Sequence, residues 1–326
     1  MSHSLPHTVM SKPIVVVGSI NLDLAVRAPR LPRPGETLLG TGFGVFTGGK
    51  GANQAVAAAR LDHPTVLIGR LGDDPYADML LRELRSAGVH SHALARVPGP
   101  SGVAVIVAAE TGENSIVVAP GANERLTPQE LNCHSSVIEN AAVVLAQLEI
   151  PEETISALTA IVSRAGIPLI LDPAPARALP HNVLESVEWI TPNESEAQVL
   201  AGRSTPARTE GELRDLAECL LRLGPRNVLL KLGERGAYLA SNNGARLMIP
   251  PYRVVAVDTT AAGDAFNAGF AVALARGACA AEAAHYASSV AAISVTRRGA
   301  FPSLPTHDEV AAFQAEHSEM HEETAL

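Results

Sequence analysis

The chain has 326 residues, of which 47% are hydrophobic and only 3% are aromatic. This length fits one large domain or two smaller ones, and the composition predicts a core of Ala, Val, Leu and Ile and excludes intrinsic disorder and disulfide scaffolds. The net charge is −9, with 25 basic against 34 acidic residues and no basic stripe, so we expect no nucleic-acid partner.

Short runs that are apolar on both faces recur along the chain and are typical of interior strands of a parallel sheet. Between them lie stretches with helical periodicity or helix-terminal residues. The alternation predicts an α/β fold, a doubly wound and mostly parallel sheet flanked by helices. The predicted strands are 14–18, 66–68, 142–148, 168–171, 187–190 and 228–230, and the predicted helices are 74–87, 152–164, 194–200, 209–223, 261–273 and 278–293.

Two segments interrupt this alternation and predict strands outside the main sheet. Residues from about 20 to 46 alternate apolar and polar side chains, and residues from about 98 to 120 hold two β-branched runs around a hairpin signal, Thr111 to Asn114. A small sheet made from both segments, over the carboxyl edge of the core, is expected to act as a lid. The predicted domain spans 13–310, between a flexible tail at 1–12 and the helix end and acidic tail at 311–326.

The three cysteines, Cys133, Cys219 and Cys279, lie far apart and form no C-x-x-C pair. We interpret them as buried thiols in a reducing compartment, which favours the cytoplasm. The first apolar run, Ile14 to Val17, is too short for a signal peptide or for a membrane span of about 20 residues. The sequence therefore predicts no membrane partner.

Common motifs for nucleotide and metal binding are incomplete or absent in this sequence. Gly44 to Lys50 matches the start of a P-loop, but Gly51 stands where that loop needs a hydroxyl for Mg²⁺. No G-x-G-x-x-G follows the first strand, so a nicotinamide cofactor has little support. His317 and His321 lack the following Glu of a zinc protease helix, and we expect them to be solvated in a tail.

The segment Gly48 to Ala55 surrounds one lysine with three glycines, which let the backbone come close to a ligand. From Ala52 onward the sequence favours a helix, whose N–H groups would face that ligand together with Asn53. The same residues also fit a tight turn, and both interpretations stay open at this point.

The segment Asp258 to Asp264 places small residues before a helix that begins near Gly263. The N–H groups of Ala261, Ala262 and Gly263 can converge on an anion at the positive end of the helix dipole. Asp264 fits a routine helix cap, and it equally fits a base that accepts a hydroxyl proton beside the bound anion.

Eight segments, in order between residue 14 and about 305, resemble the PfkB (ribokinase-like) family of carbohydrate kinases. Each is weak alone, but eight in register are highly specific. They are Asn21-Leu22-Asp23, Gly48 to Ala55, Gln147 to Pro151, Asp172 to Pro175, Thr191 to Glu196, Lys231 to Gly236, Asp258 to Asp264 and Val295 to Ala300.

The resemblance implies ATP-dependent phosphorylation of D-ribose at its 5-hydroxyl, giving ribose 5-phosphate and ADP. It implies that Asp264 is the base and that Ala261, Ala262 and Gly263 form the anion hole. The implied sugar contacts are Asn21, Asp23, Gly49, Lys50, Gly51, Asn53, Glu149 and Asp264, and the implied ATP contacts are Asn193, Lys231, Gly233, Gly236, Gly263 and Ser288.

The resemblance also implies two metal ions. Glu196 would help to hold hydrated Mg²⁺, although Asn193 and Glu196 equally fit a capped helix N-terminus. An activating K⁺ would be bound by the Asp258 carboxylate, the main-chain carbonyls of Thr260, Ser294, Arg297 and Gly299, and the Ser303 hydroxyl. Ser288 stands where many relatives carry a different polar residue.

Two alternatives stay open. One is a sister kinase acting on deoxyribose, fructose, ketodeoxygluconate, adenosine or pseudouridine. The other is a non-catalytic sugar-binding regulator, against which the intact Asn193, Gly263 and Asp264 argue. We further expect a homodimer whose lid sheets pair, with sugar and ATP as the small-molecule partners.

Overall fold

The computed structural model describes residues 11–323. The flexible tail predicted at 1–12 therefore lies outside the described residues except for its last two positions. Residues 324–326 of the predicted acidic tail lie outside them as well.

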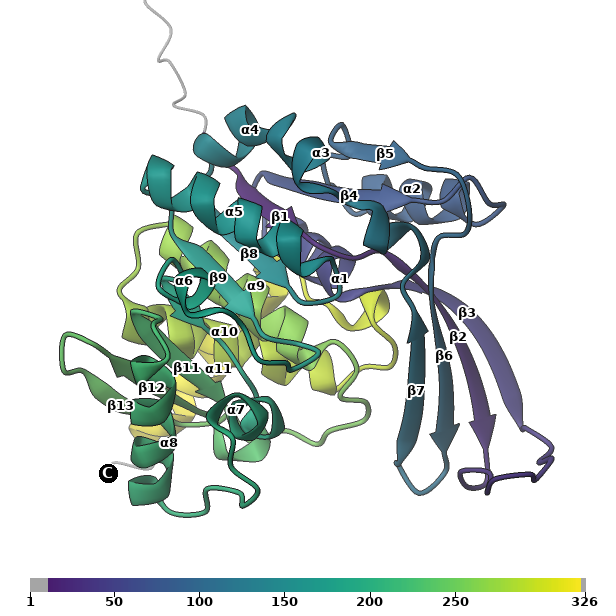
Figure 1. Cartoon of the computed structure of the whole chain (residues 1–326). Helices are drawn as coiled ribbons and strands as arrows, with labels where there is room; N and C mark the ends of the chain where they lie inside the picture. The colour runs from purple at the N-terminus through teal and green to yellow at the C-terminus, as the bar shows by residue number, and fades with distance from the viewer. Residues whose placement is uncertain (1–10, 324–326) are drawn as a thin grey trace, which may run out of the picture.

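The central sheet has nine strands in the order β13-β12-β11-β10-β9-β8-β1-β4-β5 (Figure 1). Neighbouring strands are parallel except at β11/β12 and β12/β13, which confirms the predicted doubly wound, mostly parallel sheet. The strands are β1 (Ile14–Val17), β4 (Thr65–Leu71), β5 (Leu94–Arg96), β8 (Val143–Gln147), β9 (Leu169–Asp172), β10 (Trp189–Ile190), β11 (Asn227–Lys231), β12 (Ala237–Ser241) and β13 (Arg246–Ile249).

Helices cover both faces of this sheet because successive strand residues point to opposite sides. Ile14 and Val16 belong to one apolar cluster with α1, α2, α9 and α10, whereas Val15 and Val17 belong to another with α5 and α8. The helices are α1 (Lys50–Arg60), α2 (Ala77–Ser86), α3 (Pro128–Asn132), α4 (Ser135–Glu139), α5 (Glu152–Ala165), α6 (His181–Leu184), α7 (Glu194–Ala201), α8 (Glu210–Arg222), α9 (Ala262–Ala275), α10 (Ala280–Val295) and α11 (His307–Glu323).

The two helices rich in alanine, α9 and α10, lie close together. A Cβ built on Gly269 of α9 would be 3.1 Å from the Cα of Ala287 on α10. A larger residue at this position would therefore push α10 outward by a few tenths of an ångström unless its neighbours adjust, so the small residues of both helices favour this short distance.

A second sheet of four strands, in the order β3-β2-β6-β7, projects from the body (Figure 1). Its strands are β2 (Asn21–Ala28), β3 (Gly42–Gly48), β6 (Gly102–Ala109) and β7 (Asn114–Ala119). The two predicted segments pair through β2 and β6, which are parallel, and each contributes one antiparallel neighbour. The predicted small sheet is confirmed, and we call it the lid sheet.

The hairpin of β12 and β13 and the short edge strand β5 are not among the predicted strands. The sequence also predicts a solvated tail where α11 continues as one helix to residue 323. His317 is half-buried there: its Nδ1 lies 2.8 Å from the Phe313 carbonyl, and its ring contacts Tyr252. His321 lies among residues whose side chains the structure does not describe.

The expectation of buried thiols is wrong. Cys133 and Cys279 are exposed because they lie at the capped ends of α3 and α10, and Cys219 is half-buried on α8. Among residues 11–323, no helix has both the length and the apolar character needed to cross a membrane.

Candidate active site

The N-terminus of α1 meets the loop between β1 and β2 at very short range. Gly49 has a φ of +90°, and a Cβ on it would lie 2.7 Å from the Asn21 nitrogen. A Cβ on Gly51 would lie 2.6 Å from the Ser19 nitrogen. The glycines thus form the tight turn, and this turn brings the start of α1 to the predicted site.

Asp264 lies at the centre of the site and is only 5% exposed. Its Oδ2 accepts a hydrogen bond from Asn53 Nδ2 at 2.9 Å, and its Oδ1 accepts one from Gln54 Nε2 at 3.0 Å. Burial raises the pKa of Asp264 to about 6, with help from Asp172, while Lys50 and the two hydrogen bonds oppose the rise. A carboxylate with such a pKa is suited to accept a proton near neutral pH.

Lys50, at the first position of α1, lies among carboxylates. Burial lowers the pKa of its ammonium, but Asp264, Asp172 and Glu149 together outweigh burial and raise that pKa. Glu149 accepts hydrogen bonds from Ser19 Oγ at 2.5 Å and from the Lys50 amide at 3.3 Å. The site therefore places the half-buried Lys50 ammonium within the field of several acids.

The base of the lid sheet brings two further predicted residues to this centre. Asn21 Oδ1 accepts a hydrogen bond from Asn123 Nδ2 at 2.8 Å. Asp23 lies over Gly48, where a Cβ would be 2.1 Å from its Oδ2. Burial, with the nearby charges of Glu149 and Asp264, raises the pKa of Asp23 to about 7. The predicted sugar residues thus converge from β2, α1, α9 and the segment after β8.

A cavity of about 860 Å³ opens on the other side of the N-terminus of α9. Five of the six predicted ATP residues line it, namely Lys231, Gly233, Gly236, Gly263 and Ser288. The Ser288 hydroxyl donates to the Ala284 carbonyl at 3.0 Å, so its hydrogen is engaged within α10.

Lys231 connects this cavity to the buried centre. Its Nζ donates to Asp172 Oδ1 at 2.9 Å, and Asp172 is 1% exposed. A Cβ on Gly263 would lie 3.4 Å from the same Nζ. The cavity, the ion pair and the start of α9 are therefore contiguous.

The turn before α9 leaves backbone N–H groups free. Ala261 adopts a left-handed conformation with a φ of 59° and carries no side chain that caps the helix. The Ala262 amide donates to the Thr259 carbonyl at 3.2 Å, whereas the Ala261 and Gly263 amides donate no hydrogen bond to any of residues 11–323. Of the three predicted anion-hole amides, those of Ala261 and Gly263 are therefore free in the described part of the chain, whereas that of Ala262 is engaged in the turn that the left-handed residue closes.

The N-terminus of α7 lies beside Lys231, whose amide donates to the Pro192 carbonyl at 2.9 Å. Asn193 Oδ1 accepts from the Glu196 amide at 2.9 Å, and the Glu196 carboxylate accepts from the Asn193 amide at 2.8 Å. These two residues form a capping box. Burial raises the pKa of Glu196, and the charge of Lys231 opposes the rise.

The predicted potassium ligands gather where the loop before α9 meets the loop after α10. Asp258 accepts hydrogen bonds from the Thr260 amide and the Gly299 amide, both at 2.9 Å. The Val295 carbonyl, next to Ser294, accepts from the Asp258 amide at 3.1 Å, and the Arg297 amide donates to the Ser294 carbonyl at 3.1 Å. The Ser303 hydroxyl donates to the Ala300 carbonyl at 2.7 Å. The hydrogen bonds that Asp258 accepts from backbone amides and from Thr260 lower the pKa of its carboxyl, whereas burial opposes this shift.

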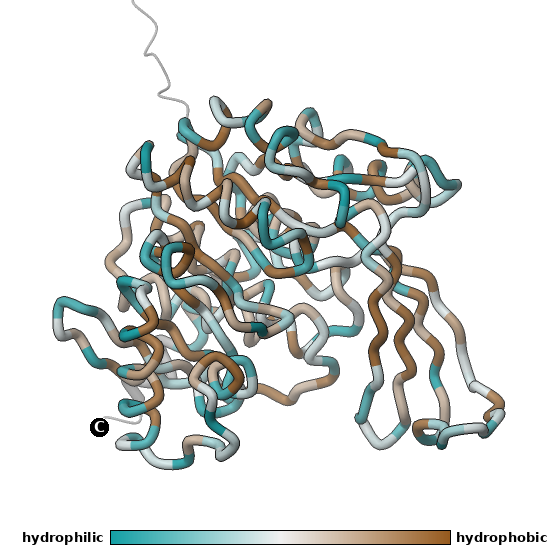
Figure 2. The backbone as a smooth tube through the Cα atoms, in the orientation of Figure 1, coloured by the Kyte–Doolittle hydropathy of each residue, from teal (hydrophilic) through white to brown (hydrophobic). Residues whose placement is uncertain are grey.

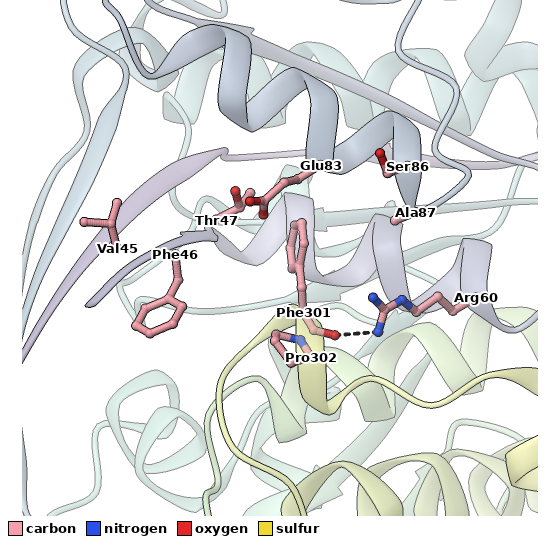
Figure 3. Close-up of a pocket in the computed structure, with 9 residues that line it drawn as sticks. All are labelled: Val45, Phe46, Thr47, Arg60, Glu83, Ser86, Ala87, Phe301 and Pro302. Carbon is pink, nitrogen blue, oxygen red and sulfur yellow. Dashed lines mark hydrogen bonds between the residues drawn. The ribbon is translucent and has the colours of Figure 1, made fainter. Parts of the chain in front are cut away.

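A second cavity, of about 420 Å³, lies between β3, α1, α2 and the segment Phe301–Ser303 (Figure 3). Arg60 donates to the Phe301 carbonyl at 2.6 Å along its edge. This cavity contains none of the predicted site residues, and its lining mixes aromatic, aliphatic and oppositely charged side chains.

The structure also connects to the site five residues that are not among the predicted site residues, namely Ser19, Gln54, Asn123, Gln147 and Asp172. Gln54, Gln147 and Asp172 lie inside segments that carried the family resemblance, so a signal for them was present. Ser19 and Asn123 had none, because their contacts join segments far apart in the chain.

Comparisons with known proteins agree with this geometry. The model of the pfkB family carbohydrate kinases matches residues 11–307. The chain is 42% identical over 298 residues to a ribokinase of Bacillus subtilis, covering 91% of this chain and 97% of that one. It is 35% identical over 298 residues to a deoxyribokinase of Salmonella typhi, covering 91% of this chain and 96% of the relative.

Solved structures show the same architecture. A structure of Arabidopsis thaliana ribokinase complexed with ribose and ATP superposes with a TM-score of 0.87 at 35% identity, covering 93% of this chain and 99% of the other. A ribokinase of Thermotoga maritima gives a TM-score of 0.84 at 37% identity, with coverage of 93% and 99%. Sequence, fold and the contiguous site together show that this chain belongs to the pfkB family of carbohydrate kinases.

Proposed function

We propose that this protein is an ATP-dependent ribose kinase that phosphorylates the 5-hydroxyl of D-ribose. The observation that carries the proposal is the position of Asp264, which separates the cluster of sugar-binding side chains from the cavity lined by Gly263 and Lys231. A sugar hydroxyl at this carboxylate would face a phosphate at the start of α9. The most similar relatives reported above bear the ribokinase name.

In this mechanism Asp264 orients the 5-hydroxyl and accepts its proton while the hydroxyl oxygen bonds to the γ-phosphorus and the bond to the β-phosphate oxygen breaks, releasing ADP. The free amides of Ala261 and Gly263 stabilise charge on the γ-phosphate oxygens. A pentose presents hydroxyl groups. The carboxylates of Asp23 and Glu149 would accept hydrogen bonds from these hydroxyls, and the Lys50 ammonium would donate hydrogen bonds to them.

Two metal ions would complete the site. Mg²⁺ neutralises phosphate charge when bound, and Glu196, a half-buried carboxylate near Lys231, would hold it through water. K⁺ would be bound by Asp258 with the carbonyls of Thr260, Ser294, Arg297 and Gly299 and the Ser303 hydroxyl. The donor set fits a weakly hydrated cation, because it is mainly uncharged oxygen, and the buried Ser294 hydroxyl has no partner within residues 11–323.

We also propose that the protein is a cytoplasmic homodimer paired through its lid sheets. Val45, Val105 and Val117 lie in one cross-strand row with Leu24 of β2 and are 38%, 46% and 68% exposed. They lie on the face opposite Asp23, because side chains alternate along β2. Figure 2 shows the hydrophobic character of these strands. A second copy would cover this apolar face, and Val117→Glu should shift the mass in sedimentation from dimer to monomer.

The decisive experiment is a sugar panel assayed for ADP release. Ribose should be the best substrate at fixed ATP. Because a deoxyribokinase is 35% identical, the panel must include 2-deoxyribose, and a preference for it would select that alternative. If no sugar or nucleoside stimulates ADP release while ribose still binds, the protein is instead a sugar-binding regulator.

A further inference from the structure

Gln54 is a fully buried residue of α1 that has no role in the proposed mechanism. Its Nε2 donates to Asp264 Oδ1 at 3.0 Å and to Asp172 Oδ2 at 3.1 Å. One amide group therefore bridges two carboxylates that come from α9 and from the end of β9.

The orientation of this amide follows from hydrogen-bond chemistry. Ionised carboxylates only accept hydrogen bonds, so the nitrogen of Gln54 must face them and its oxygen must face away. That oxygen accepts a hydrogen bond from Gln147 Nε2 at 2.6 Å. Gly18 leaves room for Gln147, because a Cβ on Gly18 would lie 2.0 Å from Gln147 Oε1. Gln147 thus holds Gln54 in the orientation that serves both acids.

The charged groups that face Asp264 are Lys50 from α1, Asp172 from β9 and Asp23 from β2. Lys50 favours the ionised form of Asp264, whereas the two acids disfavour it. Asp172 is also paired with Lys231 at 2.9 Å. Without Gln54, the carboxylates of Asp264 and Asp172 would lose the hydrogen-bond donor that they share.

We infer that Gln54 is a positioning residue, whose amide holds the Asp264 carboxylate in one orientation and keeps it apart from Asp172. The inference rests on the proposed function of Asp264 as proton acceptor. The same amide links Asp264, through Asp172, to Lys231 on the wall of the nucleotide cavity. The sugar end and the nucleotide end of the site therefore share one hydrogen-bond network.

A purely structural role for Gln54 makes different predictions. A buried amide that only fills space would change the stability of the fold without changing the titration of Asp264. The test must therefore measure this titration as well as turnover.

The variants are Gln54→Leu, which keeps a similar volume without hydrogen bonds, and Gln54→Glu, which replaces the donor by a third acid. The matched control is Asn227→Leu, which removes a buried amide that donates to Glu188 Oε1 at 3.2 Å, at the end of β11 opposite Lys231. For Gln54→Leu we expect kcat to fall about 10- to 100-fold with the KM for ATP within about threefold. The acid limb of the pH–rate profile should move to higher pH, and further for Gln54→Glu.

A second readout does not depend on turnover. In protein labelled with ¹³C at the aspartate carboxyl carbon, the Asp264 signal is assigned by its loss in Asp264→Asn, and its titration is compared between wild type and Gln54→Leu. The inference expects a higher midpoint in the variant and the wild-type midpoint in Asn227→Leu. An unchanged midpoint in a folded Gln54→Leu protein would overturn it, whether or not the wild type phosphorylates sugars. A wild type inactive on the whole sugar panel would instead contradict the proposed function, and the titration would still decide the role of Gln54.

Discussion

The N-termini of α7 and α9 both lie next to Lys231, but they differ in whether their first backbone N–H groups have hydrogen-bond partners. At α7, Asn193 and Glu196 form a capping box that engages the amides. At α9, Ala261 offers no cap, and its amide and that of Gly263 donate no hydrogen bond to any residue in the range 11–323. A capped end mainly stabilises its helix, whereas an uncapped end keeps donors and a positive dipole for an anion. The difference agrees with the proposal that α9 provides the anion-binding helix end.

The largest effect on turnover is expected from removing the Asp264 carboxylate in the first turn of α9. Asp264→Asn should lower turnover about 10²- to 10⁴-fold, because the positioned proton acceptor is lost. Binding of ribose and of ATP, measured by calorimetry, should stay within several-fold. Asp215→Asn, at an exposed carboxylate of α8, serves as the control. Near-normal turnover of Asp264→Asn would remove Asp264 as the base.

The pH dependence of turnover tests the same residue without mutation. Burial raises the pKa of Asp264 to about 6, so kcat should fall about tenfold for each pH unit below that value. A flat profile from pH 5 to 8 would contradict this. The shift also affects stability: the native pKa lies above the ordinary value of 3.8, so the native state binds more protons between these values, and the contribution of this carboxyl to the free energy of unfolding is lost as pH rises from about 4 to 6.

The open end of α9 depends on the turn that precedes it, which Asp258 ties to Gly299. Replacing K⁺ by Na⁺ at constant ionic strength should lower turnover about tenfold, because the cation would hold this turn in shape. Asp258→Ala should be slow in both salts and lose the difference between them. Equal wild-type rates in Na⁺ and K⁺ would show that protein contacts alone hold the turn.

The smallest predicted effect concerns the capped N-terminus of α7. Asn193→Ala should lower the free energy of unfolding by about 1 kcal/mol, as expected for a lost N-cap. Thr209→Ala removes the matching capping box of α8, remote from the site, and should cost the same. If Asn193 also approaches the phosphates, only its variant should raise the KM for ATP, by about three- to tenfold. Equal KM values in both variants would leave Asn193 with capping alone.

Much of the fold follows from local pattern. The strands β1, β4, β8 and β9 are mostly apolar and are buried at every position because helices cover both faces, and such runs are visible without a structure. The hairpin of β12 and β13 carried a weaker signal, since β13 has only 4 residues and is partly exposed. Exposure of the cysteines was not predictable, because it depends on which helix face meets the sheet.

The family segments also indicated most residues that line the site, since the residue types suited for sugars and phosphates stand in a specific order. They did not separate competing uses of one motif. Asn193 fits a cap and a phosphate ligand equally in sequence, and the observed capping box required the backbone of α7. Ala262 likewise belongs to the predicted anion hole, and the hydrogen bond from its amide to the Thr259 carbonyl is visible only in the structure.

The sequence by itself determined the α/β class, the lid segments and the kinase family, because periodicity and motif order are properties of neighbouring residues. The tertiary structure alone decided which side chains share a hydrogen bond. Gln54, Asp172 and Asp264 meet only because α1 and α9 begin, and β9 ends, at the same edge of the sheet. Burial at that edge also raises the pKa of Asp264, and burial depends on contacts between segments that are distant along the chain.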